Sequence, residues 1–109
     1  MVDEELISDA LSYYNRTYFE AAQHRFLAIL EVDKKHPIAN FYLAKIEGAK
    51  NNVSLALEYL ENASKNEVTV EDFWVYYAEL IIGLGNLSKA HWIIKIGLLR
   101  SVQKSKLRK

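Results

Sequence analysis

The chain has 109 residues, of which half are hydrophobic, and its 14 basic side chains balance its 14 acidic ones. This composition is typical of a small folded domain, and the lack of cysteine excludes disulfides and thiol chemistry. The N-terminus lacks the basic start and apolar run of a signal peptide, and no segment approaches the roughly 20 apolar residues of a membrane span. We therefore expect a cytoplasmic protein.

The sequence predicts helices along its whole length. Asp3 can cap a first helix that runs to about Asn15. The segment 17–20 has the spacing of a capping box, with Thr17 as the cap, and it opens a second helix that lasts to about Asp33. No stretch alternates between apolar and polar residues as a strand would.

The same reasoning gives four more helices. Pro37 can begin the third, because its missing N–H costs nothing in the first turn, and Asn51 and Asn52 end it. The remaining boundaries are a fourth helix from about Val53 to Ser64, a fifth capped by Thr69 and ended by Gly83-Leu84-Gly85, and a sixth capped by Asn86. The predicted fold class is all-α.

An internal repeat organises these helices. Shifting the chain by 34 superposes apolar residues (Phe26, Leu60 and Ile94), turn residues (Thr17, Asn51 and Gly85) and two sets of small residues (Ala10, Ala44 and Ala78; Ala22, Ala56 and Ala90). We call this shift the repeat period. Alanine lets the two helices of a pair approach closely. The sequence therefore predicts one domain over 1–102, made of three repeats at about 3–36, 37–70 and 71–102, followed by a basic tail at 103–109.

The third repeat carries a recognisable motif, Trp74-x2-Tyr77-Ala78-x2-Ile81 followed by Gly85-Asn86-Leu87-x2-Ala90-x3-Ile94. It resembles the tetratricopeptide repeats, and a related family of helical hairpins is the alternative. The resemblance implies three stacked antiparallel hairpins in a short right-handed superhelix. It also implies that the first helix of each hairpin lines a concave groove that binds a peptide or helix of another protein.

The residues expected to line this groove are largely apolar and aromatic, which suits an amphipathic helix or an extended apolar segment. The alternative is that some of these side chains only fill a tight groove. The predicted partner-binding residues are Ile7, Leu11, Tyr14, Phe41, Tyr42, Lys45, Val75, Tyr76, Glu79 and Ile82, and Glu4, Ser8 and Asp72 share their face.

The sixth helix is apolar nearly all round, although a repeat array normally ends on a polar face. A helical wheel places Ala90, Ile93, Ile94, Gly97 and Leu98 inward, and it places Trp92, Ile96 and Leu99 outward as a second interface. We expect a homodimer or an obligate heteromer to form through this outward stripe. The alternative is that the end of the chain covers it.

Charge is distributed unevenly, because residues 1–99 hold 14 acidic and 9 basic side chains whereas residues 100–109 hold five basic ones. None of the three histidines, His24, His36 and His91, has a second histidine three or four residues away, so no metal, cofactor or catalytic site is expected. The leading function is a protein-interaction module. A small dedicated chaperone for an aggregation-prone subunit is the second, and a membrane or nucleic-acid adaptor that uses the basic tail is the third and least favoured.

Overall fold

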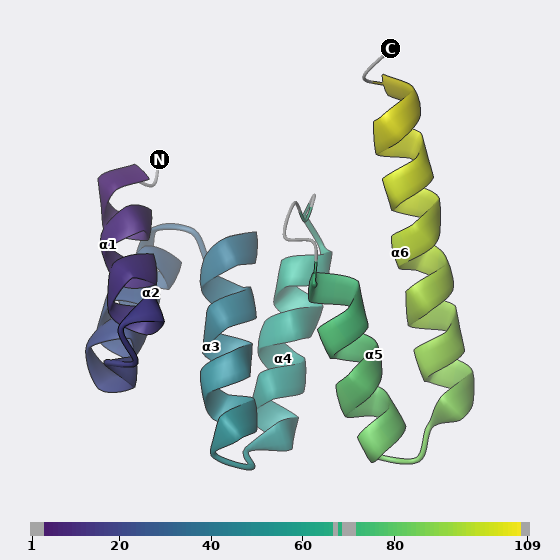
Figure 1. The fold of residues 1–109 in the computed structure, drawn as a ribbon, viewed down its shortest axis with the longest axis horizontal. Coiled ribbons are helices and arrows are strands. Elements are labelled where there is room, and N and C mark those ends of the chain that lie inside the picture. Colours follow the sequence, from purple (N-terminus) through teal and green to yellow (C-terminus); the bar gives the residue numbers. More distant parts are fainter. Residues whose placement is uncertain (1–3, 67, 69–71, 108–109) are drawn as a thin grey trace. The chain divides into compact units, whose positions relative to one another are not determined.

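A computed structural model describes residues 4–66, 68 and 72–107, and the side chains only up to residue 100. This part of the chain holds six α-helices and no strand, which confirms the all-α class (Figure 1). The helices are α1 (Glu4–Asn15), α2 (Phe19–Val32), α3 (Pro37–Ala49), α4 (Val53–Ser64), α5 (Phe73–Gly83) and α6 (Leu87–Leu107). The chain divides into two compact units, residues 1–70 and residues 71–109, and each is described by itself.

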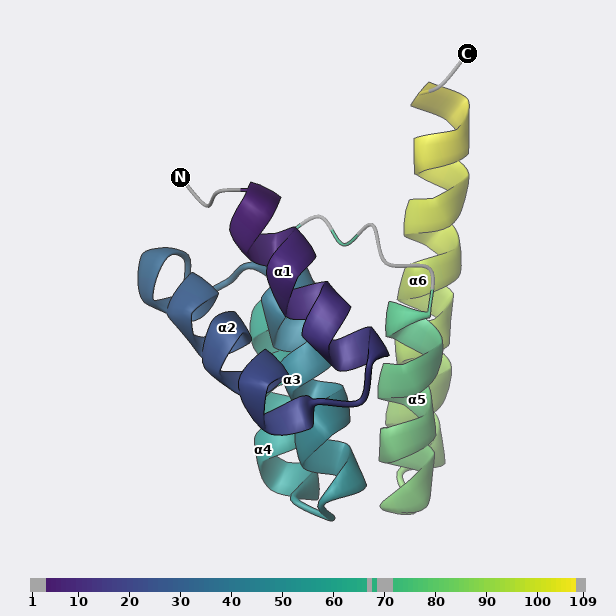
Figure 2. The ribbon, with the colours of Figure 1, turned by 60° about the vertical axis from the view of Figure 1, so that its left-hand side comes forward.

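The first unit consists of two antiparallel hairpins, α1–α2 and α3–α4, and α2 packs on α3 (Figures 1 and 2). Alanines at the predicted repeat positions let the helices approach closely, and Ala10, Ala22, Ala44 and Ala56 have no exposed surface. Larger side chains fill the space between the hairpins. One core cluster combines Ala10, Ala22, Phe26, Ile29, Ala39, Leu43 and Ile46.

The second unit is the hairpin α5–α6, in which a glycine sets the distance between the helices. A Cβ atom on Gly97 would lie 2.6 Å from Cγ of Trp74, so that the indole ring occupies the space beside the α6 backbone. α6 has 21 residues and α5 has 11, and α6 therefore projects well beyond the end of its partner helix (Figure 2). The helix includes residues 103–107 of the predicted tail.

The three turns inside the hairpins share one hydrogen-bond pattern. Thr17, Asn51 and Gly85 have positive φ angles of 66°, 67° and 82°. In each turn this residue donates its N–H to the carbonyl three residues back, and the next residue donates to the carbonyl five residues back. These two bonds define the Schellman motif that ends a helix. The predicted turn positions, one repeat period apart, are confirmed.

One predicted cap is wrong. Thr17 belongs to the end of α1 and has a left-handed backbone, so it cannot cap α2, which begins after Tyr18. The Thr17 hydroxyl instead donates to the carbonyl of Arg16 at 2.6 Å. Asn86 is confirmed as a cap, because its Oδ1 accepts from the N–H of Lys89 at 3.0 Å. The predicted caps Asp3 and Thr69 lie outside the described residues.

Candidate functional site

A groove of about 660 Å³ lies in the first unit, along α1 and beside the start of α3. Half-buried apolar side chains form its floor, and exposed polar side chains form most of its wall. The floor residues are Ile7, Leu11 and Ile38, and the wall residues are Glu4, Ser8, Ser12, Asn15 and Arg16.

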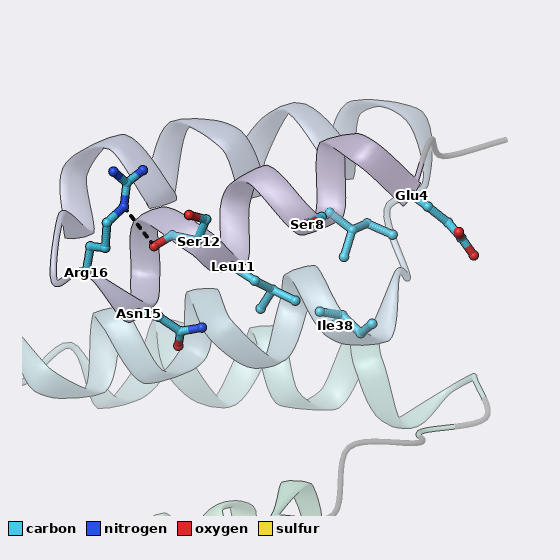
Figure 3. Close-up of a pocket in the computed structure, with 8 residues that line it drawn as sticks. Glu4, Ser8, Leu11, Ser12, Asn15, Arg16 and Ile38 are labelled. Atoms are coloured by element: carbon cyan, nitrogen blue, oxygen red, sulfur yellow. Dashed lines mark hydrogen bonds between the residues drawn. The ribbon is translucent and has the colours of Figure 1, made fainter.

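Helical spacing explains how α1 presents one face to this groove. Residues three and four positions apart lie on the same side of a helix, so Glu4, Ile7, Ser8 and Leu11 share a face. Figure 3 shows that Leu11 and Ile38 point toward one another across the space between α1 and α3. The floor residues Ile7, Leu11 and Ile38 also pack against the core cluster of the first unit, which fixes their positions.

Arg16 stands at one end of the groove, and its side chain turns away from the floor (Figure 3). Its Nε donates to the carbonyl of Ser12 at 3.4 Å. The guanidinium carbon also lies 5.0 Å from the ring centre of Tyr13 and 5.4 Å from that of Tyr18. These contacts hold the cation at the rim through cation–π attraction.

Two predicted groove residues pack into an aromatic cluster instead of lining the groove. Tyr14 lies edge-on to Tyr42, with 4.8 Å between ring centres, and Tyr42 stacks on Phe26 at 5.5 Å. Both tyrosines are half-buried against the core. Burial, followed by the nearby Tyr42, raises the pKa of Tyr14 above its ordinary value of 10.0. The cluster therefore supports the floor of the groove, and its burial favours the neutral form of Tyr14.

Phe41 was also expected to line the groove, but it is 2% exposed. Its ring lies edge-on to Tyr42 at 5.1 Å, and the Lys45 ammonium lies 5.4 Å from its centre. Phe41 is therefore buried in the structure, and Lys45 is half-buried beside it.

In the second unit, the predicted groove residues lie on α5. Val75, Ile82 and Glu79 are exposed, and Tyr76 is half-buried. Asp72 precedes α5 and is exposed as well. A groove shared by all three hairpins remains a prediction.

Ser12, Asn15, Arg16 and Ile38 line the groove although the sequence analysis did not select them. The repeat could have predicted one of them, because Ile38 lies one repeat period after Glu4, which was expected on the groove face. The polar residues carried no such signal, since Ser12, Asn15 and Arg16 read as an ordinary solvated helix end.

The sixth helix differs from its predicted orientation. Ala90 and Ile93 are buried as expected, and so is Gly97. Ile94 and Leu98, which were predicted to face inward, are 42% and 64% exposed. The apolar arc of this helix is wider than the surface that α5 covers, so a wheel alone could not select the buried part.

The predicted outer interface is exposed. Trp92 and Leu99 are 60% and 61% exposed, and Ile96 is half-buried. We call these three residues the Trp92 stripe. Such large apolar side chains are a surface at which association releases ordered water.

His36 caps α3 beside the groove. Its Nδ1 accepts a hydrogen bond from the N–H of Ala39 at 3.3 Å, which fixes the first turn from which Ile38 projects. Burial lowers the pKa of His36 below its ordinary value of 6.5, against a smaller opposing effect of Asp33. The cap therefore requires the neutral imidazole.

We expect the stability of the chain to fall in mild acid through His36. The folded state disfavours the protonated ring, so the stabilisation is complete above about pH 6.5 and is lost as the pH falls through the lowered pKa. His36→Asn keeps a capping oxygen that does not titrate. The variant should match the native chain at pH 7.5 and exceed it by about 0.5–1 kcal/mol at pH 5, as measured by urea unfolding. His24→Asn, an exposed site on α2, is the control, and an equal effect of both substitutions would contradict this role.

The described part of the chain offers no clustered metal ligands and no membrane-spanning helix. It holds no group of three or more metal-binding side chains. None of its described helices combines the length and apolarity needed to cross a membrane.

Comparisons with known proteins establish the fold. No protein-family model matches the sequence. No curated protein matches it significantly either. Among solved structures, the chain is similar to the type III secretion translocator chaperone SycD of Yersinia enterocolitica, in a crystal structure described as an alternative dimer. The TM-score is 0.76 and the identity 21%, over 96% of this chain and 80% of that chain.

Proposed function

We propose that this chain is a protein-binding module of helical hairpins, similar to tetratricopeptide repeats, that holds a segment of another protein in the groove along α1. The groove itself carries the proposal, because it offers an apolar floor of Ile7, Leu11 and Ile38 inside a polar wall. An amphipathic segment fits this pattern, with apolar side chains on the floor and polar ones toward the wall.

The chaperone form of this function is the more specific version. A small chaperone shields apolar segments of its client until the client assembles, and it needs an apolar groove on a rigid scaffold. The structural similarity to a secretion chaperone supports this version at the level of fold. Its particular expectation is a client that loses solubility or abundance when this protein is absent.

Crosslinking tests the groove directly. A photoreactive amino acid at Ser8, which is exposed and lines the groove, should capture a protein in living cells. The same amino acid at Ser54, which is exposed on α4 outside the groove, should not capture that protein. The captured protein should also become insoluble or scarce when the gene is deleted, if the chaperone version holds.

A matched pair of substitutions completes the test. Ser8→Arg places a bulky cation in the groove without disturbing the core, and it should weaken binding of the captured client by about tenfold or more, the loss of about one apolar anchor. Ser54→Arg should leave the affinity unchanged. Equal binding by both variants would overturn the groove as the site.

Association through the Trp92 stripe is a second candidate, favoured by the exposure of Trp92 and Leu99. In this form the chain is a homodimer or part of a heteromer. Light scattering of the purified chain over a hundredfold concentration range separates the two forms, because a homodimer forms without a partner and a heteromer does not. Trp92→Glu should abolish any dimer that uses the stripe. A native dimer that survives this substitution would count against it.

A further inference from the structure

A second apolar stripe runs along α6, on a different side from the Trp92 stripe. Its members are four and seven residues apart and therefore share one face of the helix. They are strongly exposed, at 67%, 42% and 64%. We call Leu87, Ile94 and Leu98 the Ile94 stripe.

The repeat shows what covers the equivalent face elsewhere in the chain. Ile94 lies two repeat periods after Phe26, which sits on α2 and has no exposed surface. Phe26 is covered because α3 packs on α2: the ring of Tyr42 stacks on it at 5.5 Å, and Leu43 and Ile46 belong to the same core cluster. The face that bears Ile94 is thus the face on which this chain elsewhere packs another helix.

The charge of α6 indicates what kind of helix would pack on the Ile94 stripe. The sequence of α6 contains five basic residues and no Asp or Glu. The exposed side chains of His91 and Lys95 lie between the two apolar stripes. Of the basic side chains that the structure describes on α6, Lys95 lies beside the Ile94 stripe, whereas Lys89 and Arg100 lie on the opposite side of the helix. Two copies of α6 packed through this stripe would bring like charges at Lys95 close together, whereas an acidic side chain of a docked helix would attract Lys95.

We propose that the Ile94 stripe docks an acidic amphipathic helix of a different protein, which packs on α6 as α3 packs on α2. A membrane surface fits the exposed face less well. A helix that lies in a bilayer interface needs one continuous apolar face, and His91 and Lys95 interrupt it here. This proposal uses α6 alone and stands whether or not the groove along α1 binds a client.

The probe is a pair of synthetic peptides of about 21 residues, long enough to be helical in isolation. Both carry Leu and Ala on one face, and their other face is Glu in the first peptide and Lys in the second. Titration against the full chain, followed by fluorescence anisotropy, should show the Glu peptide binding at least ~10-fold more tightly in 50 mM salt. The difference should shrink in 0.5 M salt because exposed charges are then screened.

Three variants locate the binding. Leu98→Glu removes one apolar contact at an exposed site, and Lys95→Glu reverses the charge beside it, so each should weaken the Glu peptide by about tenfold. Val32→Glu changes an equally exposed apolar residue on α2 and should have no effect. Circular dichroism of each variant should show an unchanged fold, because all three sites are exposed.

Other results would overturn the proposal in distinguishable ways. Equal affinity for the Glu and Lys peptides would show that charge does not select the partner. An affinity for the Glu peptide that is unchanged by Leu98→Glu would show that the Ile94 stripe is not the binding site. A dimer of the native chain that dissociates with Leu98→Glu would show that a second copy is the occupant. Binding to phosphatidylserine vesicles, lost with Leu98→Glu and accompanied by no peptide binding, would assign the stripe to membranes. Ser8→Arg should leave peptide binding unchanged, which separates this result from that of the groove.

Discussion

Replacing Phe26 by Ala should lower the free energy of unfolding of the first unit by about 3–5 kcal/mol. Phe26 has no exposed surface and stacks on Tyr42 with ring centres 5.5 Å apart and planes 5° from parallel. Its loss leaves a cavity between α2 and α3 and removes an aromatic contact. Since whole domains are stable by only about 5–15 kcal/mol, this single change should bring the unit close to unfolding.

Phe19→Ala is the matched control, because Phe19 lies on the same helix and is 45% exposed. It contacts Tyr14 edge-on at 5.3 Å, so its removal should cost no more than about 1.5 kcal/mol. Urea unfolding monitored by circular dichroism measures both variants. Similar losses for the two phenylalanines would show that α2 and α3 do not pack as described.

Gly97→Ala should destabilise the hairpin α5–α6 although alanine is the better helix former. The added Cβ would lie 2.6 Å from Cγ and 2.7 Å from Cβ of Trp74, so the ring or the helix must move. Such overpacking costs about 1–3 kcal/mol, against a gain of about 1 kcal/mol in helix propensity. We expect a net loss of up to about 2 kcal/mol.

Gly83→Ala provides the control, because no atom lies within 4 Å of the Cβ that it would add at the end of α5. This change should be neutral or stabilise by up to about 1 kcal/mol. In a Trp92→Phe background Trp74 is the one remaining tryptophan. Its fluorescence should shift when Gly97→Ala is added and should not shift when Gly83→Ala is added. A stabilising effect of Gly97→Ala would contradict the close approach of α6 to Trp74.

Much of the fold could be predicted from the small residues and the turns. Alanine at a fixed period has one simple physical use, the close approach of two helices, and Ala78 and Ala90 are nearly as buried as their counterparts in the first unit. The turns were predictable for a related reason. A residue that ends a helix in a left-handed conformation recurs with the period, even though Thr17 is a poor residue for that conformation.

The surfaces were harder to predict, because exposure depends on what a face meets. Phe41 and Val75 are both large apolar residues on first helices, but Phe41 is buried and Val75 is 56% exposed. Ile94 occupies the repeat position of Phe26, yet the structure leaves it 42% exposed. A pattern of apolar residues indicates which faces are able to pack, and the neighbouring elements decide which of them do.

The hairpin turns bear on how the chain is made. Each turn is closed by hydrogen bonds that span at most five residues, so closing it costs little conformational entropy. A hairpin can therefore form before the residues that follow it have been synthesised. During translation α1 and α2 can therefore pair while α3 is still inside the ribosome. Until α3 emerges, the nascent hairpin displays the side chain of Phe26 to the solvent. Ile94, at the same repeat position on α6, is 42% exposed, so the hairpin α5–α6 presents the face that the first hairpin presents before α3 emerges.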